Sequence, residues 1–286
     1  MKFLDVKTDY AFKKVFGSIE SKEILISFLN ALIYSDSKIK IKDLTIVDPY
    51  NIPMIKGVKD TFVDVKALLD NNTTVIIEMQ ILNHQGFEKR VLYNAAKNYS
   101  VQLQKTDNYD LLNPVIALSI VDFIMFEENN NVINRFKLIE KETFINYNDD
   151  IELIFIELPK FNLTLNQLTN IKDEWIYFVK NAGSLEYVPS NLSKDIQTAL
   201  EVINEANMTQ DELEAQYKRK EFIYIQKLAI KKAQNDGFEQ GVEKGIEKGI
   251  EQEKLTIAKN SIKNGLDDKT ISIITGLDID TIKNLR

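Results

Sequence analysis

The sequence predicts a mixed α/β (α+β) fold, in which a core of a helix, a three-stranded meander, a second helix and a further strand precedes a long helical extension. Three observations predict it. Apolar residues near the start of the chain recur at helical spacing, and β-branched runs separated by turn residues follow them. The last quarter of the chain then has a charged, helical pattern.

Two helices are expected at the start of the chain. In TDYAFKKVF, residues 8–16, Phe12 and Phe16 stand four residues apart and therefore share one face of a helix. Gly17 interrupts this pattern, and Ser21 is expected to cap a second, apolar helix that runs to about Ile33.

A sheet is expected next. Residues 43–48, 60–69 and 73–82 have strand character, and the turn-forming stretches PYNIPMIKG and DNNT connect them, so they predict an antiparallel meander. A helix is expected over about 85–105 and a central strand within NPVIALSIVDF, residues 113–123. Two further strands, at about 132–140 and 151–158, are expected to extend the sheet.

Helices are predicted for the rest of the chain. The stretch LTLNQLTNIKDEWIYFVKNAG predicts a helix that ends at Gly183, and a long charged helix is expected over 209–264. Within it, glycines recur every fourth residue beside an apolar stripe of Phe238, Val242, Ile246 and Ile250. Each Gly costs about 0.8–1 kcal/mol relative to Ala, which a close helix–helix contact would offset. A partly disordered tether is the alternative.

The last segment, residues 265–286, resembles a helix-turn-helix with a small core of Ile271, Ile274, Leu277 and Ile282. Its final helix is acidic at its N-terminus, where helices that read the major groove present donors or basic groups. A capping or protein-contact module is therefore favoured over a DNA reader.

Composition limits the chemistry that the chain can perform. Its 286 residues include no cysteine and one histidine, which excludes disulfides and thiolate metal sites and leaves only a hard, oxygen-bound metal. The N-terminus has no apolar signal region and no run is long enough for a membrane span, so a cytoplasmic protein is expected. The net charge of −7 weakens a nucleic-acid-binding interpretation, although a metal-dependent nuclease also needs acidic residues.

One predicted hairpin carries the candidate chemistry. Its strands read FVDVKALL and TTVIIEMQ, with Asp64 on the first and Glu78 and Gln80 on the second. A three-residue loop, either Asp70 to Asn72 or Asn71 to Thr73, puts Asp64, Lys66, Glu78 and Gln80 on one face, whereas a two-residue turn separates the two carboxylates. Two carboxylates on one face suit Mg²⁺ or Mn²⁺. Carboxylates on a solvated sheet face are the alternative.

The sequence resembles the PD-(D/E)XK nuclease superfamily and, within it, the Rpn family of recombination-promoting nucleases and transposases. The residues that carry the resemblance are TDYAFKKVFG (8–17), VDVKALL (63–69), IIEMQ (76–80), KRVLYNAAKNYS (89–100) and NPVIALSIVDF (113–123). Their order and spacing match along about the first 125 residues, and the C-terminal repeats are similar too. The expected organisation is a nuclease-like domain over 1–185, a helical region over 186–264 and a small segment over 265–286.

This resemblance implies a Mg²⁺- or Mn²⁺-dependent DNA endonuclease in which Asp64 and Glu78 are the metal ligands. Gln80 stands where the wider superfamily has a lysine that orients or activates water, and glutamine cannot act as a general base. Lys66 is the candidate for the missing positive charge. Asp9, in the first turn of the first helix, matches an acidic position of the family and is a candidate third contact, although it also complements the helix dipole.

Other residues are candidates by their position. Arg90, Asn94 and Lys97 follow helical spacing after the motif and are expected to contact phosphates, with a plain solvated face as the alternative. Asp60 is an alternative acidic member of the site, and His84 is expected in an exposed loop. The aromatic residues Trp175, Tyr177 and Phe178 are expected in the core.

The leading hypothesis is therefore a DNA endonuclease that forms a homodimer through the long C-terminal helix. A catalytically inactive nuclease fold that binds DNA or oligomerises is the alternative. A transposase proper is a third hypothesis, but only the acidic terminal helices could supply its target recognition.

Overall fold

The structure, a computed structural model, describes residues 1–35, 37–51 and 61–286. Two units make most of their contacts within themselves, Met1–Ile223 and Tyr224–Arg286. Among the described residues, no helix combines the length and the apolar character that crossing a membrane requires.

The first unit is built on a six-stranded mixed sheet with the strand order β1-β4-β5-β6-β8-β7. Strand β4 is antiparallel to β1 and β5, the neighbours β5, β6 and β8 are parallel, and β7 is an antiparallel edge strand. The strands are Leu44–Val47 (β1), Val65–Leu69 (β4), Thr74–Gln80 (β5), Val115–Val121 (β6), Ile133–Phe136 (β7) and Ile151–Glu157 (β8). A separate two-residue ladder pairs β2 (Tyr50–Asn51) with β3 (Thr61–Phe62).

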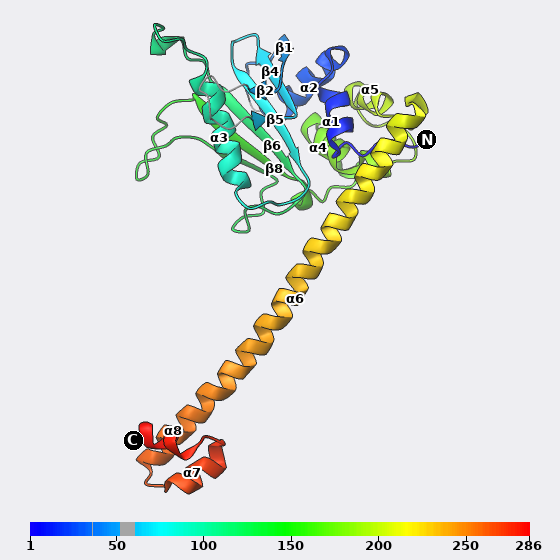
Figure 1. Cartoon of the computed structure of the whole chain (residues 1–286). Helices are drawn as coiled ribbons and strands as arrows, with labels where there is room; N and C mark the ends of the chain where they lie inside the picture. The colour runs from blue at the N-terminus through cyan, green and yellow to red at the C-terminus, as the bar shows by residue number, and fades with distance from the viewer. Residues whose placement is uncertain (36, 52–60) are drawn as a thin grey trace. The chain divides into compact units, whose positions relative to one another are not determined.

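Helices cover both faces of this sheet, as Figure 1 shows. One face carries α3 (Phe87–Ser100), which makes the crossover that the parallel neighbours β5 and β6 require. The other face carries α1 (Asp9–Phe16), α2 (Lys22–Leu32), α4 (Ile171–Asn181) and α5 (Lys194–Val202). The main core lies on this second side, where the fully buried ring of Trp175 packs among Phe16, Phe28 and Phe178.

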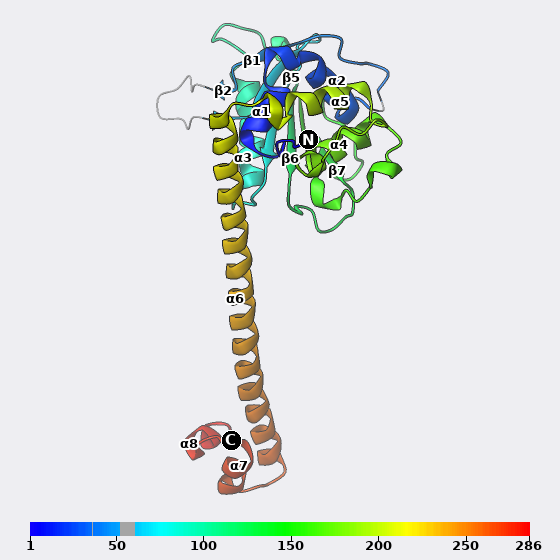
Figure 2. The same cartoon turned by 90° about the vertical axis from the view of Figure 1, so that its right-hand side faces the viewer.

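The long helix α6 (Gln210–Lys263) begins in the first unit and ends in the second. Thr209 and Glu212 form a capping box at its start, since the Thr209 N–H donates to the Glu212 carboxylate (2.7 Å) and the Glu212 N–H donates to the Thr209 hydroxyl (3.3 Å). In the second unit, α7 (Asp268–Thr275) and α8 (Ile279–Asn284) fold against the end of α6, around buried Ala258, Ile271 and Ile282 (Figure 2).

The predicted order of helix, meander, helix and strand is confirmed, and both further strands extend the sheet. Four details differ. The strand expected over 60–69 is broken at Val63 and Asp64, between β3 and β4. Ser21 does not cap α2, because its hydroxyl donates to the carbonyl of Lys14 instead. The helix expected from 163 begins only at Ile171, where Asn170 caps it. Ile274, expected in the C-terminal core, is exposed.

Candidate active site

The β4–β5 hairpin has a three-residue loop. Val65 pairs with Ile77, and Leu69 hydrogen-bonds to Thr73 across a three-residue loop of Asp70 to Asn72. Asn72 has the left-handed φ of 66° that such loops require. The paired register ends at Val65 and Ile77, and Asp64 lies in the break just before β4, where its N–H donates to the carbonyl of Ile77, the residue before Glu78, at 3.1 Å. The loop is therefore the first of the two predicted three-residue loops.

Asp64 is a largely buried carboxylate with two partners. Its Oδ2 accepts a hydrogen bond from the backbone N–H of Met79 at 2.8 Å, and its Oδ1 lies 3.7 Å from the Nζ of Lys13 on α1. Burial raises the pKa of the Asp64 carboxyl, and the Met79 hydrogen bond and Lys13 oppose this shift only in part. The charge of Asp9 raises the pKa of Asp64 further. Asp64 therefore stands in a site that favours an added cation.

Glu78 shares this environment. Burial raises the pKa of its carboxyl to about 7, the Arg90 guanidinium lowers it, and the charge of Asp64 raises it. The charge of Asp64 therefore acts on Glu78, in agreement with the hydrogen bond that Asp64 accepts from Met79, the residue next to Glu78. A second positive charge at this position would favour the ionised form of both groups.

Arg90, from the second turn of α3, reaches into this site. Its Nη2 donates to the carboxylate of Glu78 and, at 2.6 Å, to the side-chain oxygen of Gln80. The guanidinium also lies over the ring of Phe87, 5.3 Å from its centroid. Arg90 thus contacts the residues of the hairpin motif itself, as well as being a candidate phosphate contact.

The side chain of Gln80 is fixed at both ends. Its Nε2 donates to the carbonyl of Leu82 at 2.7 Å, which leaves its oxygen as the acceptor that faces Arg90. This orientation presents an oxygen beside the Glu78 carboxylate. Since an amide has no useful basicity, Gln80 can bind a cation here but cannot remove a proton.

The donor set fits a hard divalent cation. Two buried carboxylates and one amide oxygen are ligands that Mg²⁺ and Mn²⁺ take, with water completing the shell. The guanidinium that joins Glu78 and Gln80 shows that these oxygens already act as a cation-binding group. Within 1–35, 37–51 and 61–286, no cluster of three or more acidic or histidine side chains is arranged to hold a metal.

Lys66 and Asp9 have partners outside the hairpin pair. Burial lowers the pKa of the Lys66 ammonium, and the charge acting against this shift is that of Asp48. Asp9 is exposed and forms an ion pair with Arg219 of α6 at 3.2 Å. Asp60 lies outside the described residues. The cation beside Asp64 is therefore Lys13, which the sequence interpretation missed although it follows Asp9 by four residues, one turn of the same helix.

Two of the three residues expected to contact phosphates are buried. The side of α3 that packs on the sheet includes Asn94 and Lys97, which are 1% and 8% exposed. Because they are buried, Asn94 and Lys97 cannot form part of a surface that binds nucleic acid. The prediction that they contact phosphates, which was made from their helical spacing, was therefore wrong. Only Arg90, at the open start of the helix, is accessible. His84 lies in an exposed loop, as expected.

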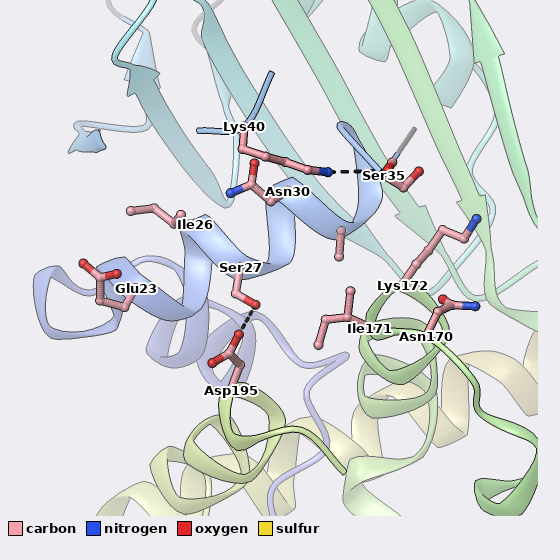
Figure 3. Close-up of a pocket in the computed structure, with 11 residues that line it drawn as sticks. Glu23, Ile26, Ser27, Asn30, Ser35, Lys40, Asn170, Ile171, Lys172 and Asp195 are labelled. Atoms are coloured by element: carbon pink, nitrogen blue, oxygen red, sulfur yellow. Dashed lines mark hydrogen bonds between the residues drawn. The ribbon is translucent and has the colours of Figure 1, made fainter. Parts of the chain in front are cut away.

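A cavity of about 740 Å³ lies elsewhere, between α2, the start of α4 and the start of α5 (Figure 3). The hydroxyl of Ser27 donates to Asp195 at 2.5 Å across it and accepts from the indole N–H of Trp175 at 3.3 Å. None of the hairpin residues lines this cavity. These two hydrogen bonds connect α2 with α4 and α5. The carboxylate pair of the hairpin remains the stronger candidate for chemistry.

Comparison with known proteins finds a family match over the part of the chain that contains the candidate site. A family model described as PD-(D/E)XK nuclease family transposase matches residues 6–233. That stretch contains the hairpin, α1, α3 and the first turns of α6. Neither a curated protein nor a solved structure matches the chain.

Proposed function

Because the chain belongs to the PD-(D/E)XK nuclease family transposases, we propose that it is a DNA endonuclease that hydrolyses phosphodiester bonds with Mg²⁺ or Mn²⁺. The observation that carries the proposal is the position of the Asp64 carboxylate, which accepts a hydrogen bond from the N–H of Met79, the residue next to Glu78, at the end of the β4–β5 hairpin. A nuclease-like function follows from the family, and the metal and the endonuclease activity are the proposed part.

The carboxylates of Asp64 and Glu78 would hold the cation, and the side-chain oxygen of Gln80 would support it. The chemistry that a bound Mg²⁺ or Mn²⁺ supplies is activation of water and neutralisation of charge on the phosphate. The chain itself orients the ligands: the Met79 N–H fixes Asp64, and the Leu82 carbonyl fixes Gln80. Lys13 and Arg90 add positive charge at the entrance of an otherwise acidic site.

Cleavage of supercoiled plasmid DNA tests this proposal. Wild-type protein should nick or linearise the plasmid with Mg²⁺ or Mn²⁺ and not with EDTA, whereas Asp64→Ala and Glu78→Ala should each lower the rate by at least about 10²-fold. Asp149→Ala is the matched control, because Asp149 is an exposed carboxylate paired with Lys137. Full activity in both hairpin variants would refute the proposal.

We also propose that the protein is a homodimer that associates through the second-unit part of α6. Gly237, Gly241, Gly245 and Gly249 have no neighbouring atom within 4 Å of where a Cβ would lie. The adjacent apolar stripe, Phe238, Val242, Ile246 and Ile250, is exposed. An exposed apolar stripe beside residues without side chains is suited to a second helix, and two copies of the site would address two DNA strands.

A further inference from the structure

Lys13 lies beside the Asp64 carboxylate on its solvent side. It lies one turn after Asp9 on α1, and its Nζ is 3.7 Å from Oδ1 of Asp64. That distance makes an ion pair and is too long for a good hydrogen bond. About half of the Lys13 side chain is exposed, whereas Asp64 is largely buried, so the ammonium group marks the solvent side of the carboxylate.

Three other cations, on α1, α3 and α6, have hydrogen-bond partners at shorter distances. Arg90 hydrogen-bonds to both Glu78 and Gln80. Lys14 hydrogen-bonds to Tyr10 at 3.1 Å and to Glu212 at 3.3 Å, and Arg219 hydrogen-bonds to Asp9 at 3.2 Å. Lys13 therefore combines proximity to Asp64 with donors that can turn to a new acceptor.

We propose that Lys13 is a catalytic residue that binds the phosphate group being hydrolysed and supplies the charge that Gln80 lacks. This inference rests on the nuclease function proposed above. An ammonium group is a compact point charge that binds phosphate oxygens well. In the reaction, the oxygen of water bonds to phosphorus, the bond from phosphorus to the leaving sugar oxygen breaks, and a proton of water passes through solvent to that oxygen. Lys13 stays protonated throughout and stabilises the charge on the non-bridging oxygens.

Single-turnover cleavage and Mn²⁺ binding of the full chain together test the assignment. In Lys13→Gln the cleavage rate should fall about 10²-fold, as when one donor to a developing oxyanion is removed. Mn²⁺ affinity, measured by calorimetry without DNA, should stay the same or rise, because the variant removes a cation from beside Asp64. Lys22→Gln is the control, since it removes another partly exposed lysine that pairs with an aspartate, Asp43, and should change neither quantity.

A rescue experiment uses the absence of cysteine from the chain. In Lys13→Cys, alkylation with 2-bromoethylamine restores an amine of lysine length at position 13 alone. Cleavage should return, with a pH profile displaced toward the lower pKa of the new amine. Such a displacement would not follow from a purely structural role.

Three outcomes would overturn the inference. Cleavage by Lys13→Gln within twofold of wild type would exclude Lys13 and leave the nuclease proposal intact. Parallel loss of cleavage and Mn²⁺ binding, without rescue by alkylation, would make Lys13 a structural residue. A wild-type chain that cuts no DNA with any divalent metal would overturn both the inference and the proposed function.

Discussion

Two amide oxygens on α3, those of Asn94 and Asn98, are buried without a hydrogen-bond partner among the described residues. An unsatisfied buried polar group costs about 1–3 kcal/mol. Asn94 lies on the helix face that packs on the sheet, beside the buried apolar residues Val91 and Ala95. An apolar side chain would suit this position better for stability.

Asn94→Leu should therefore raise the free energy of unfolding by about 1 kcal/mol. Urea denaturation of the metal-free protein measures the change, with the exposed Asn130→Leu as a control that should be close to neutral. A loss of 1 kcal/mol or more in Asn94→Leu would show instead that a bound group, such as an ordered water, satisfies the amide.

There is a physical reason why some residues of the candidate site could be predicted from the sequence and others could not. Asp64 and Glu78 lie at the end of one hairpin, so local pairing and loop parity brought them into consideration together, whereas the break in the strand at Asp64 was not foreseen. Arg90, Asn94 and Lys97 share a helical face, but the sequence does not specify which face packs on the sheet when polar residues occupy it. Lys13 on α1 and Asp64 are far apart in the sequence and meet only in the folded protein. Spacing along the chain therefore does not reveal that Lys13 is the cation beside Asp64.

At the scale of the element, the hairpin loop sets both stability and site geometry. Asn72 has a φ of 66°, a conformation that glycine and asparagine tolerate and β-branched residues do not. Asn72→Val should lower the free energy of unfolding by about 1–2 kcal/mol and also weaken Mn²⁺ binding, because the same turn fixes the register of Asp64 and Glu78. Asn72→Gly should preserve both. Unchanged stability in Asn72→Val would contradict the assigned turn.

The contact between α1 and α6 links the site helix to the long helix. Thr8 hydrogen-bonds to Gln216 at 2.8 Å, Asp9 pairs with Arg219, and Tyr10 donates to the carboxylate of Glu212. These residues of α6 recur at three- and four-residue spacing, so one face of its first turns holds α1. The position of Lys13 and Asp9 therefore depends on this helix pair.

This contact predicts a dependence of stability on pH. The Tyr10 hydrogen bond, followed by hydrogen bonds from Thr209, lowers the pKa of Glu212 from 4.5 to about 2. A carboxyl group with a lowered pKa stabilises the folded state above its unfolded pKa and loses that contribution as pH falls, here from about 4.5 toward 2. Thermal unfolding between pH 6 and 3 should therefore decline more in wild type than in Glu212→Gln. Parallel declines would contradict the assignment.

At the scale of the whole molecule, the apolar stripe of α6 predicts self-association. Sedimentation velocity should show a dimer, and Ile246→Lys should shift it toward monomer by placing a charge in the stripe. Glu243→Lys is the matched control, because it adds a lysine to the same helix outside the stripe. A wild-type protein that is monomeric at every concentration would exclude the proposed dimer.

Periodic patterns explain why the element order was predictable over most of the chain. The sheet strands and α6 have clear apolar or charged periods, and both were identified. Helix α5 was missed as a separate element, because its inward residues Ile196, Ala199 and Leu200 occupy a stretch of only nine residues between polar turns. Helix α5 packs against α1 and α2, which are distant from it in the sequence, and the local pattern of apolar residues does not predict this contact.

A cation bound between Asp64 and Glu78 is the central feature of the proposed active site. Anomalous diffraction from a crystal of the full chain soaked with Mn²⁺ measures this. We predict a manganese peak within bonding distance of both carboxylates, with the Arg90 guanidinium moved away from Glu78. A fully occupied manganese ion bound elsewhere, with the Arg90–Glu78 contact intact, would contradict the proposed site.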